Sequence, residues 1–204
     1  MATVDLFAIG NALIDQEFKV SNEFLTEQAL QKGTMQLTDA ATQAALYQKL
    51  QDTQAYKGQA SGGSAANTTV AFSALGGTAF YGCRVGNDEL GSIYLNCLNE
   101  ASIQTTDRSI SEGVTGTCMV LISPDSERTM HTYLGITAEL SAEHIDFDGL
   151  KTAKWLYIEG YLSTSDTARL AVKQAREIAK SHGVKIALSL SDPAMVQYAR
   201  QGLE

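Results

Sequence analysis

Two adjacent glycines that lead into a run of small residues form the part of the sequence best suited to binding a polar ligand. The run is Gly62-Gly63-Ser64-Ala65-Ala66-Asn67. Glycine lets the backbone approach a ligand closely, and the first N–H groups of a helix have no partner within it. Those N–H groups and the Asn67 amide would form a cluster of hydrogen-bond donors. The alternative is a Gly-Ser linker that caps a helix, because Ser64 is an ordinary N-cap residue.

A second polar pair, Asn11 and Asp15, follows the apolar run at residues 6–9. In an extended segment, residues four apart lie on the same face, so both side chains can point into one pocket. A carboxylate accepts several hydrogen bonds, which suits Asp15 to a vicinal diol. The alternative is an Asp that caps nearby backbone N–H groups.

Two further charged residues lie where they could reach a ligand. Arg128 follows a turn between two β-prone runs and could stabilise the negative charge of a phosphoryl group. Its alternative role is a solvated hairpin Arg paired with Glu127 or Asp125. Glu159 follows the apolar run 155–158, where an ionisable group is costly without a partner. It could contact a ligand or belong to a turn that ends the strand.

The elements that must position these residues alternate between strands and helices. Strands are predicted at residues 6–9, 80–85, 155–158 and 185–190. Helices are predicted at residues 38–50, 65–75, 89–100 and 166–182. Carboxylates in the first turn of the helix at 89–100 suit the helix dipole, so we interpret Asp88 as structural. This alternation predicts an α/β fold with a layered sheet.

Two regions interrupt this alternation with short strands that lack crossover helices. They are residues 17–20 with 34–37, and residues 103–109 with the hairpin-like stretch 117–133. These strands predict a small β layer that projects from the main sheet. Ligands in open α/β sheets bind beyond the carboxyl ends of the strands, so such a layer could close over them as a lid.

Composition narrows the class of partner. The 204 residues are 44% hydrophobic with a formal net charge of -8, which gives no basic face for nucleic acid or an anionic membrane. The sequence has no basic leader and no apolar run of about 20 residues, which predicts a cytoplasmic protein. The three cysteines and three histidines follow no metal-ligand spacing, so we predict no metal site among them.

Several stretches together resemble one family of small-molecule kinases. They are residues 9–15, the Gly62-Gly63 turn with Asn67, Val85-Gly86-Asn87-Asp88-Glu89-Leu90-Gly91, Glu127-Arg128-Thr129 and Tyr157-Ile158-Glu159-Gly160-Tyr161. In order and spacing they are similar to the ribokinase-like (PfkB) family, and most similar to its adenosine-kinase-like branch. The resemblance spans nearly the whole chain.

The resemblance implies a Rossmann-like α/β domain with a β lid and the ATP-dependent phosphorylation of a hydroxymethyl group, with ATP and Mg²⁺ as cofactors. Relatives can also pair through their lids, which makes a homodimer possible. Arg128 would stabilise the phosphates. The substrate-binding residues that the resemblance implies are Asn11, Asp15, Gly62, Gly63, Asn67 and Glu159. Motifs of P-loop, dinucleotide-binding and nucleophile-elbow proteins do not occur in the sequence.

Two signatures of that family are missing from the sequence, a Gly-Ala-Gly-Asp turn that carries the catalytic base and an Asn-x-x-Glu motif linked to Mg²⁺ and ATP. We therefore expect residues 1–204 to form an incomplete ribokinase-like domain, with a lid at about 16–37 and 103–133. The ATP-binding part and the catalytic Asp would lie beyond residue 204. An alternative of another class is a catalytically inactive ligand-binding module.

The substrate is expected to be a nucleoside similar to adenosine. Apolar residues on the predicted lid could contact a purine base, namely Met35, Leu37, Tyr133 and Leu134. A sugar such as ribose, fructose or a keto-deoxy sugar is the second expectation, since residues that bind a diol would serve both classes of substrate.

Overall fold

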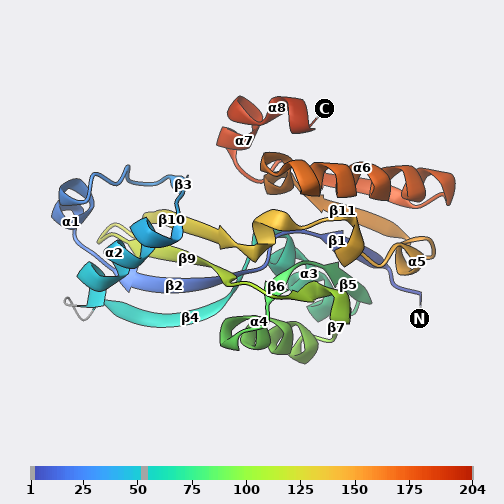
Figure 1. The fold of residues 1–204 in the computed structure, drawn as a ribbon, viewed down its shortest axis with the longest axis horizontal. Coiled ribbons are helices and arrows are strands. Elements are labelled where there is room, and N and C mark those ends of the chain that lie inside the picture. Colours follow the sequence, from blue (N-terminus) through green and yellow to red (C-terminus); the bar gives the residue numbers. More distant parts are fainter. Residues whose placement is uncertain (1–2, 52–54, 204) are drawn as a thin grey trace.

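The larger half of the molecule is built around a parallel sheet of five strands (Figure 1). The computed structural model describes residues 3–51 and 55–203. The strands of this main sheet are β1 (Leu6–Ile9), β5 (Ala79–Gly82), β7 (Ile103–Gln104), β11 (Trp155–Glu159) and β12 (Lys185–Ser189), in the order β12-β11-β1-β5-β7. Each neighbouring pair runs parallel. The predicted α/β fold with a parallel sheet is confirmed.

Helices cover both faces of the main sheet, which explains why its strands read as continuous apolar runs. Alternate residues of β1 serve the two faces. Phe7 and Ile9 pack in a cluster with α6 (Asp166–Ser181), whose buried face consists of alanines that allow close approach. Leu6 and Ala8 pack in a second cluster with α3 (Ser64–Ala74) and α4 (Glu89–Glu100).

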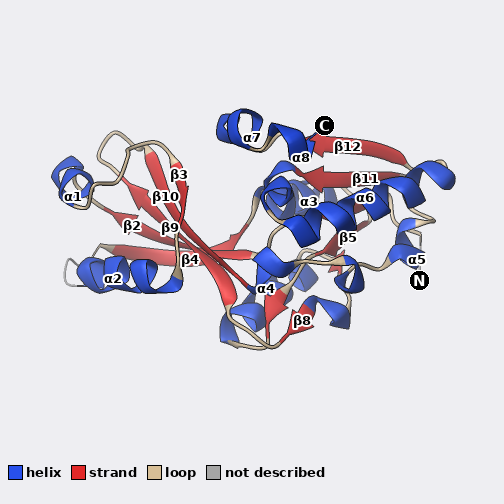
Figure 2. Cartoon of the chain, turned by 45° about the horizontal axis from the view of Figure 1, so that its top comes forward, coloured by secondary structure: helices blue, strands red, loops and turns tan. Residues whose placement is uncertain are grey.

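A second sheet, called the accessory sheet below, projects from one end of the main sheet (Figures 1 and 2). Its strands are β2 (Leu13–Lys19), β3 (Met35–Leu37), β4 (Tyr56–Gly62), β9 (Thr115–Ile122) and β10 (Arg128–Gly135), in the order β3-β10-β9-β2-β4. The strands β9 and β10 form the predicted antiparallel hairpin. One face is covered by α1 (Asn22–Glu27) and α2 (Ala40–Gln51), which bury a core of Phe18, Leu25, Leu46, Leu50, Met119 and Leu121.

The boundaries of the predicted lid need two corrections. Residues 103–104 are not part of the accessory sheet, because Ile103 is buried beside β5 in the main sheet and residues 107–109 form a short 3₁₀ helix, η1. The strand β4 was not predicted. It is an edge strand whose residues are mostly exposed, so its sequence lacks the alternation of apolar and polar residues by which strands are recognised.

The other predicted elements agree with the structure to within a few residues, with one exception. The predicted strand at 80–85 is two strands, because β5 ends at Gly82 and β6 (Val85–Gly86) instead pairs with β8 (Ile110–Ser111). The remaining helices are short. They are η2 (Ile136–Glu139), η3 (Ala142–His144), α5 (Phe147–Leu150), η4 (Gly160–Thr164), α7 (Pro193–Tyr198) and α8 (Arg200–Leu203). None of the helices in the described parts is long and apolar enough to cross a membrane.

Asp88 joins the two halves of the molecule. Its carboxylate caps α4 by accepting from the Gly91 N–H at 2.7 Å, as the structural interpretation predicted. It also accepts from the N–H and the hydroxyl of Thr115, at 2.8 and 2.6 Å. Because Thr115 is the first residue of β9, this carboxylate anchors the accessory sheet at its base.

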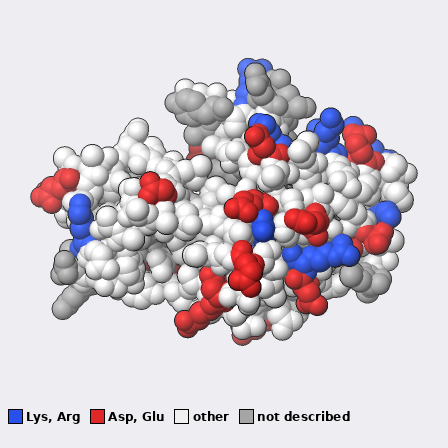
Figure 3. Space-filling model, in the orientation of Figure 1, with Lys and Arg blue, Asp and Glu red and all other residues white. Residues whose placement is uncertain are grey.

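Charged side chains are dispersed on the face seen in Figure 3, where Lys and Arg lie among Asp and Glu rather than in one basic patch. Several form surface ion pairs, such as Lys32 with Asp125 at 2.6 Å and Lys154 with Asp5 at 2.6 Å. Exposed pairs of this kind contribute little to stability. The accessory-sheet half shows few charges in this view.

Candidate functional site

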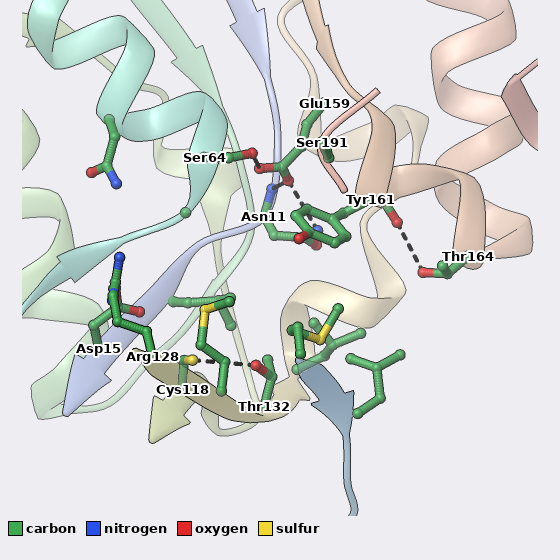
Figure 4. Close-up of a pocket in the computed structure, with 17 residues that line it drawn as sticks. Asn11, Asp15, Ser64, Cys118, Arg128, Thr132, Glu159, Tyr161, Thr164 and Ser191 are labelled. Carbon is green, nitrogen blue, oxygen red and sulfur yellow. Dashed lines mark hydrogen bonds between the residues drawn. The ribbon is translucent and has the colours of Figure 1, made fainter. Parts of the chain in front are cut away.

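A pocket of about 230 Å³ lies where the accessory sheet meets the carboxyl ends of β1 and β11 (Figure 4). Ligands of open α/β sheets bind at this position. The wall on the main-sheet side includes Asn11, Gly63, Ser64, Asn67, Glu159 and Tyr161. The wall on the accessory side includes Leu13, Asp15, Met35, Leu37, Cys118, Arg128, Met130, Thr132 and Leu134. Every predicted site residue except Gly62 therefore lines one pocket.

Asp15 lies on β2 beside Cys118 of β9, and its carboxylate accepts no hydrogen bond from the residues that the structure describes. Burial raises the pKa of Asp15 to about 6, while the positive charge of Arg128 lowers this pKa and the negative charge of Glu17 raises it. A partly buried carboxylate without donors is unfavourable. The alternative role of Asp15 as a cap is therefore not supported, and the side chain is available to a ligand.

The two glycines have different roles from the one expected. A Cβ at Gly62 would overlap the Asp15 carboxylate, so Gly62 makes room for that side chain and does not itself line the pocket. Gly63 has a φ of 98°, and a Cβ there would lie 2.8 Å from the Asn11 carbonyl oxygen. A side chain at Gly63 would therefore collide with the protein's own backbone before it reached a ligand.

Glu159 is 1% exposed and both of its carboxylate oxygens are occupied within the protein. Oε2 accepts from the backbone N–H of Asn11 at 2.8 Å and from its side-chain amide at 3.0 Å. Oε1 accepts from the Ser64 hydroxyl at 2.5 Å and from the Ala65 N–H at 3.1 Å. Four donors fill the acceptor positions of a carboxylate, which argues against the expected ligand contact by Glu159.

The turn at Asn11 is held from three further sides. The hydroxyl of Tyr81 donates to the Asn11 carbonyl oxygen at 2.8 Å, and that of Tyr94 donates to the Gly62 carbonyl oxygen at 3.3 Å. Burial raises the pKa of both phenols well above the ordinary range, so they remain donors. Thr137, in the helix that follows β10, accepts from the Ala12 N–H at 3.1 Å.

The expected cluster of free helix donors is only partly present. Gly63, not Ser64, is the N-cap of α3, and Ser64 is the first helical residue. The Ala65 N–H binds Glu159, and the Asn67 N–H binds the Gly63 carbonyl oxygen at 3.0 Å. The exposed side chain of Asn67 lines the pocket and stays available.

Arg128 is the first residue of β10 and brings positive charge to the accessory wall. Its side chain is exposed and lies beside Asp15 in Figure 4. The alternative pairing with Asp125 or Glu127 is not present among the described residues, since Asp125 pairs with Lys32. The guanidinium therefore faces the pocket with its hydrogen-bonding groups available.

Strand geometry decides which of the apolar residues predicted to contact a base line the pocket. Met35, Leu37 and Leu134 line the pocket, but Tyr133 does not. Side chains alternate along a strand, so in β10 the residues Met130, Thr132 and Leu134 share one face and Tyr133 belongs to the other. The same alternation, applied to the sequence, would have found Met130 and Thr132.

Cys118 and Tyr161 were not predicted as pocket residues. Cys118 lies in the accessory wall and accepts a hydrogen bond from the Thr132 hydroxyl at 3.3 Å. Burial raises its pKa to about 12, so the thiol stays protonated and contributes a polarisable surface. Its sequence context, a strand-like apolar run, gave no signal for a role in binding. Tyr161 lies on η4, directly after β11, and covers the opposite wall.

The described residues do not bring together three His, Cys, Asp or Glu side chains in a way that could hold a metal ion. Asp15 is the only carboxylate of the accessory wall among the described pocket residues, and Glu159 is already occupied. The donor set present here therefore does not by itself fit Mg²⁺.

Comparison with known proteins gives one family and several similar chains. A model of the pfkB family carbohydrate kinases matches residues 33–204. The guanosine-inosine kinase of Escherichia coli (strain K12) is 30% identical over 190 residues, which cover 89% of this chain and 44% of that protein.

Two solved structures share the fold along nearly the whole chain. A probable sugar kinase protein from Rhizobium etli CFN 42 is 32% identical, with a TM-score of 0.92. The match covers 100% of this chain and 61% of the sugar kinase chain. The adenosine kinase from Sinorhizobium meliloti is 34% identical, with a TM-score of 0.91. The match covers 99% of this chain and 61% of the adenosine kinase chain. The chain thus spans less than two thirds of the length of these relatives.

Proposed function

Because the chain belongs to the pfkB family of carbohydrate kinases, we propose that it forms the substrate-binding part of a kinase that transfers the γ-phosphate of ATP to a hydroxymethyl group. We propose a nucleoside similar to adenosine as the substrate. Relatives named for adenosine and for guanosine and inosine support this substrate class.

The observation that carries the proposal is the division of one pocket into a polar and an apolar region. Asp15, Asn11 and Asn67 supply hydrogen-bonding groups suited to ribose hydroxyls, whereas Met35, Leu37 and Leu134 supply an apolar surface suited to a planar base. A nucleoside has both regions within one molecule. A free sugar would use only the polar part.

The residues of this chain would act mainly by binding and orientation. The ionised Asp15 would accept hydrogen bonds from a vicinal diol, which contribute on the order of 1.5–3 kcal/mol each. Arg128 would stabilise the negative charge that spreads over the transferred phosphoryl group. Closure of the accessory sheet over the pocket would exclude water that could otherwise take up that group.

ATP would supply the phosphoryl group and Mg²⁺ would neutralise its charge. No Gly-Ala-Gly-Asp turn occurs in the 204 residues, and we assign no catalytic base among them. We propose that the base and most of the ATP site belong to other segments of a longer protein. Pairing of two copies through the accessory sheet remains a prediction.

The proposal is tested by calorimetric titration of residues 1–204 with adenosine, guanosine, inosine, ribose and fructose. We expect a ribonucleoside to bind at least tenfold more tightly than either free sugar, because only the nucleoside covers the apolar wall. Tighter binding of a sugar would support a sugar kinase instead. Binding of none of these compounds, by a chain shown to be folded, would contradict the proposal.

A further inference from the structure

We infer that Glu159 is a positioning residue, which sets the geometry of the substrate-binding wall through Asn11 and the start of α3 and does not touch the substrate. This inference rests on the proposed function, because it names what prepares that same pocket. Figure 4 shows the Glu159 carboxylate between Ser64 and Asn11, at the edge of the pocket.

The carboxylate connects segments that are far apart in the sequence. Asn11 follows β1, Ser64 and Ala65 begin α3, and Glu159 ends β11, so the contacts span 148 and 94 residues of sequence. Two of the four donors are backbone N–H groups, whose positions depend on the path of the chain. Glu159 therefore fixes the main chain at two crossings between the halves of the molecule: at Asn11 the chain passes from β1 of the main sheet to β2 of the accessory sheet, and at Ser64 it returns from β4 to α3.

The same contacts fix which way the Asn11 side chain points. Its amide nitrogen donates to Glu159 at 3.0 Å, and its amide oxygen accepts from the Thr137 hydroxyl at 3.4 Å. An amide nitrogen has two hydrogens, so one remains for a ligand. Without the Glu159 carboxylate, the Asn11 amide could turn over, so that its oxygen would replace its nitrogen at the pocket. The oxygen cannot donate a hydrogen bond to a substrate hydroxyl.

The stabilisation of this buried carboxylate comes from hydrogen-bond donors rather than a cation. The described residues include no Lys or Arg ion pair with Glu159, and the Ala65 N–H lies at the N-terminus of α3, where the helix dipole favours negative charge. The variant Glu159→Gln keeps the shape but introduces an NH₂ group. Whichever way it turns, this group faces the backbone N–H of either Asn11 or Ala65.

The test compares nucleoside affinity and amide hydrogen exchange in single and double variants of residues 1–204. Glu159→Gln is expected to weaken adenosine binding at least tenfold and to speed exchange of the Asn11 and Ala65 amide hydrogens. In the Asn11→Ala background, Glu159→Gln is expected to weaken binding less than threefold, because its effect passes largely through Asn11. Glu143→Gln, the same change at an exposed position, is the matched control and should alter neither measurement.

Two results would overturn the inference. Effects of Glu159→Gln and Asn11→Ala that multiply fully would indicate a direct contact between Glu159 and the ligand. Unchanged affinity in a folded Glu159→Gln variant would show that the carboxylate does not matter for binding.

If Glu159→Gln fails to fold, Ser64→Ala removes one of the four donors and provides a milder variant. It is expected to weaken binding about threefold and to speed exchange at Ala65, and an unchanged affinity would contradict the inference. If the unchanged chain binds no nucleoside, the proposed function fails, while amide exchange in Glu159→Gln still decides whether this carboxylate orders the two segments.

Discussion

The two walls of the pocket differ in how far the protein itself satisfies their polar groups. On the main-sheet side, Asn11 is held by Glu159, Tyr81 and Thr137 before any ligand arrives. On the accessory side, Asp15 and Arg128 form no hydrogen bond or ion pair within the described parts of the chain, and Leu37 is 50% exposed. One wall is preorganised, and the other keeps its binding capacity for the ligand.

This difference has a physical reason. The main-sheet wall follows strands that are buried on both faces, where each polar group must find a partner. The accessory sheet is covered by helices on one face only. Its other face borders a pocket, where polar groups can bind a ligand or water and need no partner within the protein. The main-sheet side thus gives rigid support, while the accessory side presents open polar groups to a ligand.

The largest expected effect comes from removing the open carboxylate. Asp15→Ala should weaken nucleoside binding by roughly 10- to 100-fold, since about 1.5–3 kcal/mol is lost with each charge-assisted hydrogen bond. The fold should remain intact, because the side chain has no internal partner to lose. Calorimetry with circular dichroism checks both points. Unchanged affinity would remove Asp15 from the site.

A change at Arg128, the cation on the same wall, is expected to reduce turnover rather than binding, by a similar factor. Arg128→Lys in the full-length enzyme should lower kcat about tenfold, because lysine lacks the planar fork that binds phosphate oxygens in pairs. The KM for nucleoside should change less. Steady-state kinetics provide the measurement, and full turnover in this variant would show that Arg128 has no phosphate role.

Gly63→Ala tests the preorganised wall. The positive φ and the nearby Asn11 carbonyl oxygen make a side chain unfavourable there, at a cost of about 1–3 kcal/mol. Thermal unfolding should show this loss of stability, with weaker nucleoside binding of several-fold. Gly76→Ala is a useful comparison, since that glycine also has a positive φ but no atom within 4 Å of the added Cβ. If the two variants bind nucleoside with equal affinity, the close approach to the Asn11 carbonyl oxygen has no effect on binding, and Gly63→Ala acts only through backbone strain.

The smallest expected effect is that of pH. With a pKa of about 6, Asp15 loses charge as the pH falls, so nucleoside affinity should drop about fourfold between pH 7 and 5.5. The sign for stability is opposite. Since the pKa is raised from 3.8 on folding, the folded state binds this proton more tightly, and Asp15 disfavours folding as the pH rises through about 6. Asp15→Asn should abolish the Asp15 part of both dependences, which titration of the two proteins side by side would show.

A chain of residues 1–204 alone is expected to bind nucleoside without phosphorylating it. The sequence has no Gly-Ala-Gly-Asp turn to provide a base. An assay for ADP with adenosine and ATP measures this, and ADP release that depends on adenosine would contradict the assignment of catalysis to other segments.

Local sequence patterns were sufficient for most of the main sheet and for its long helices. Buried strands such as Leu6–Ile9 are continuous apolar runs, and helices such as Glu89–Glu100 carry a recognisable cap. Edge strands were harder. β4 has few apolar residues, and β7 has only two residues, whose place in the main sheet depends on pairing with β5.

The sequence by itself determined which charged and amide groups the pocket would contain, because motifs at Asn11, Asp15, Asn67 and Arg128 are readable as residue types at fixed spacing. Only the tertiary structure decided which of these groups are free. Glu159 and Asp15 are both carboxylates at the pocket, yet one meets four donors and the other meets none among the described residues. Those donors come from segments distant in the chain, and no local pattern records which segments the fold brings together.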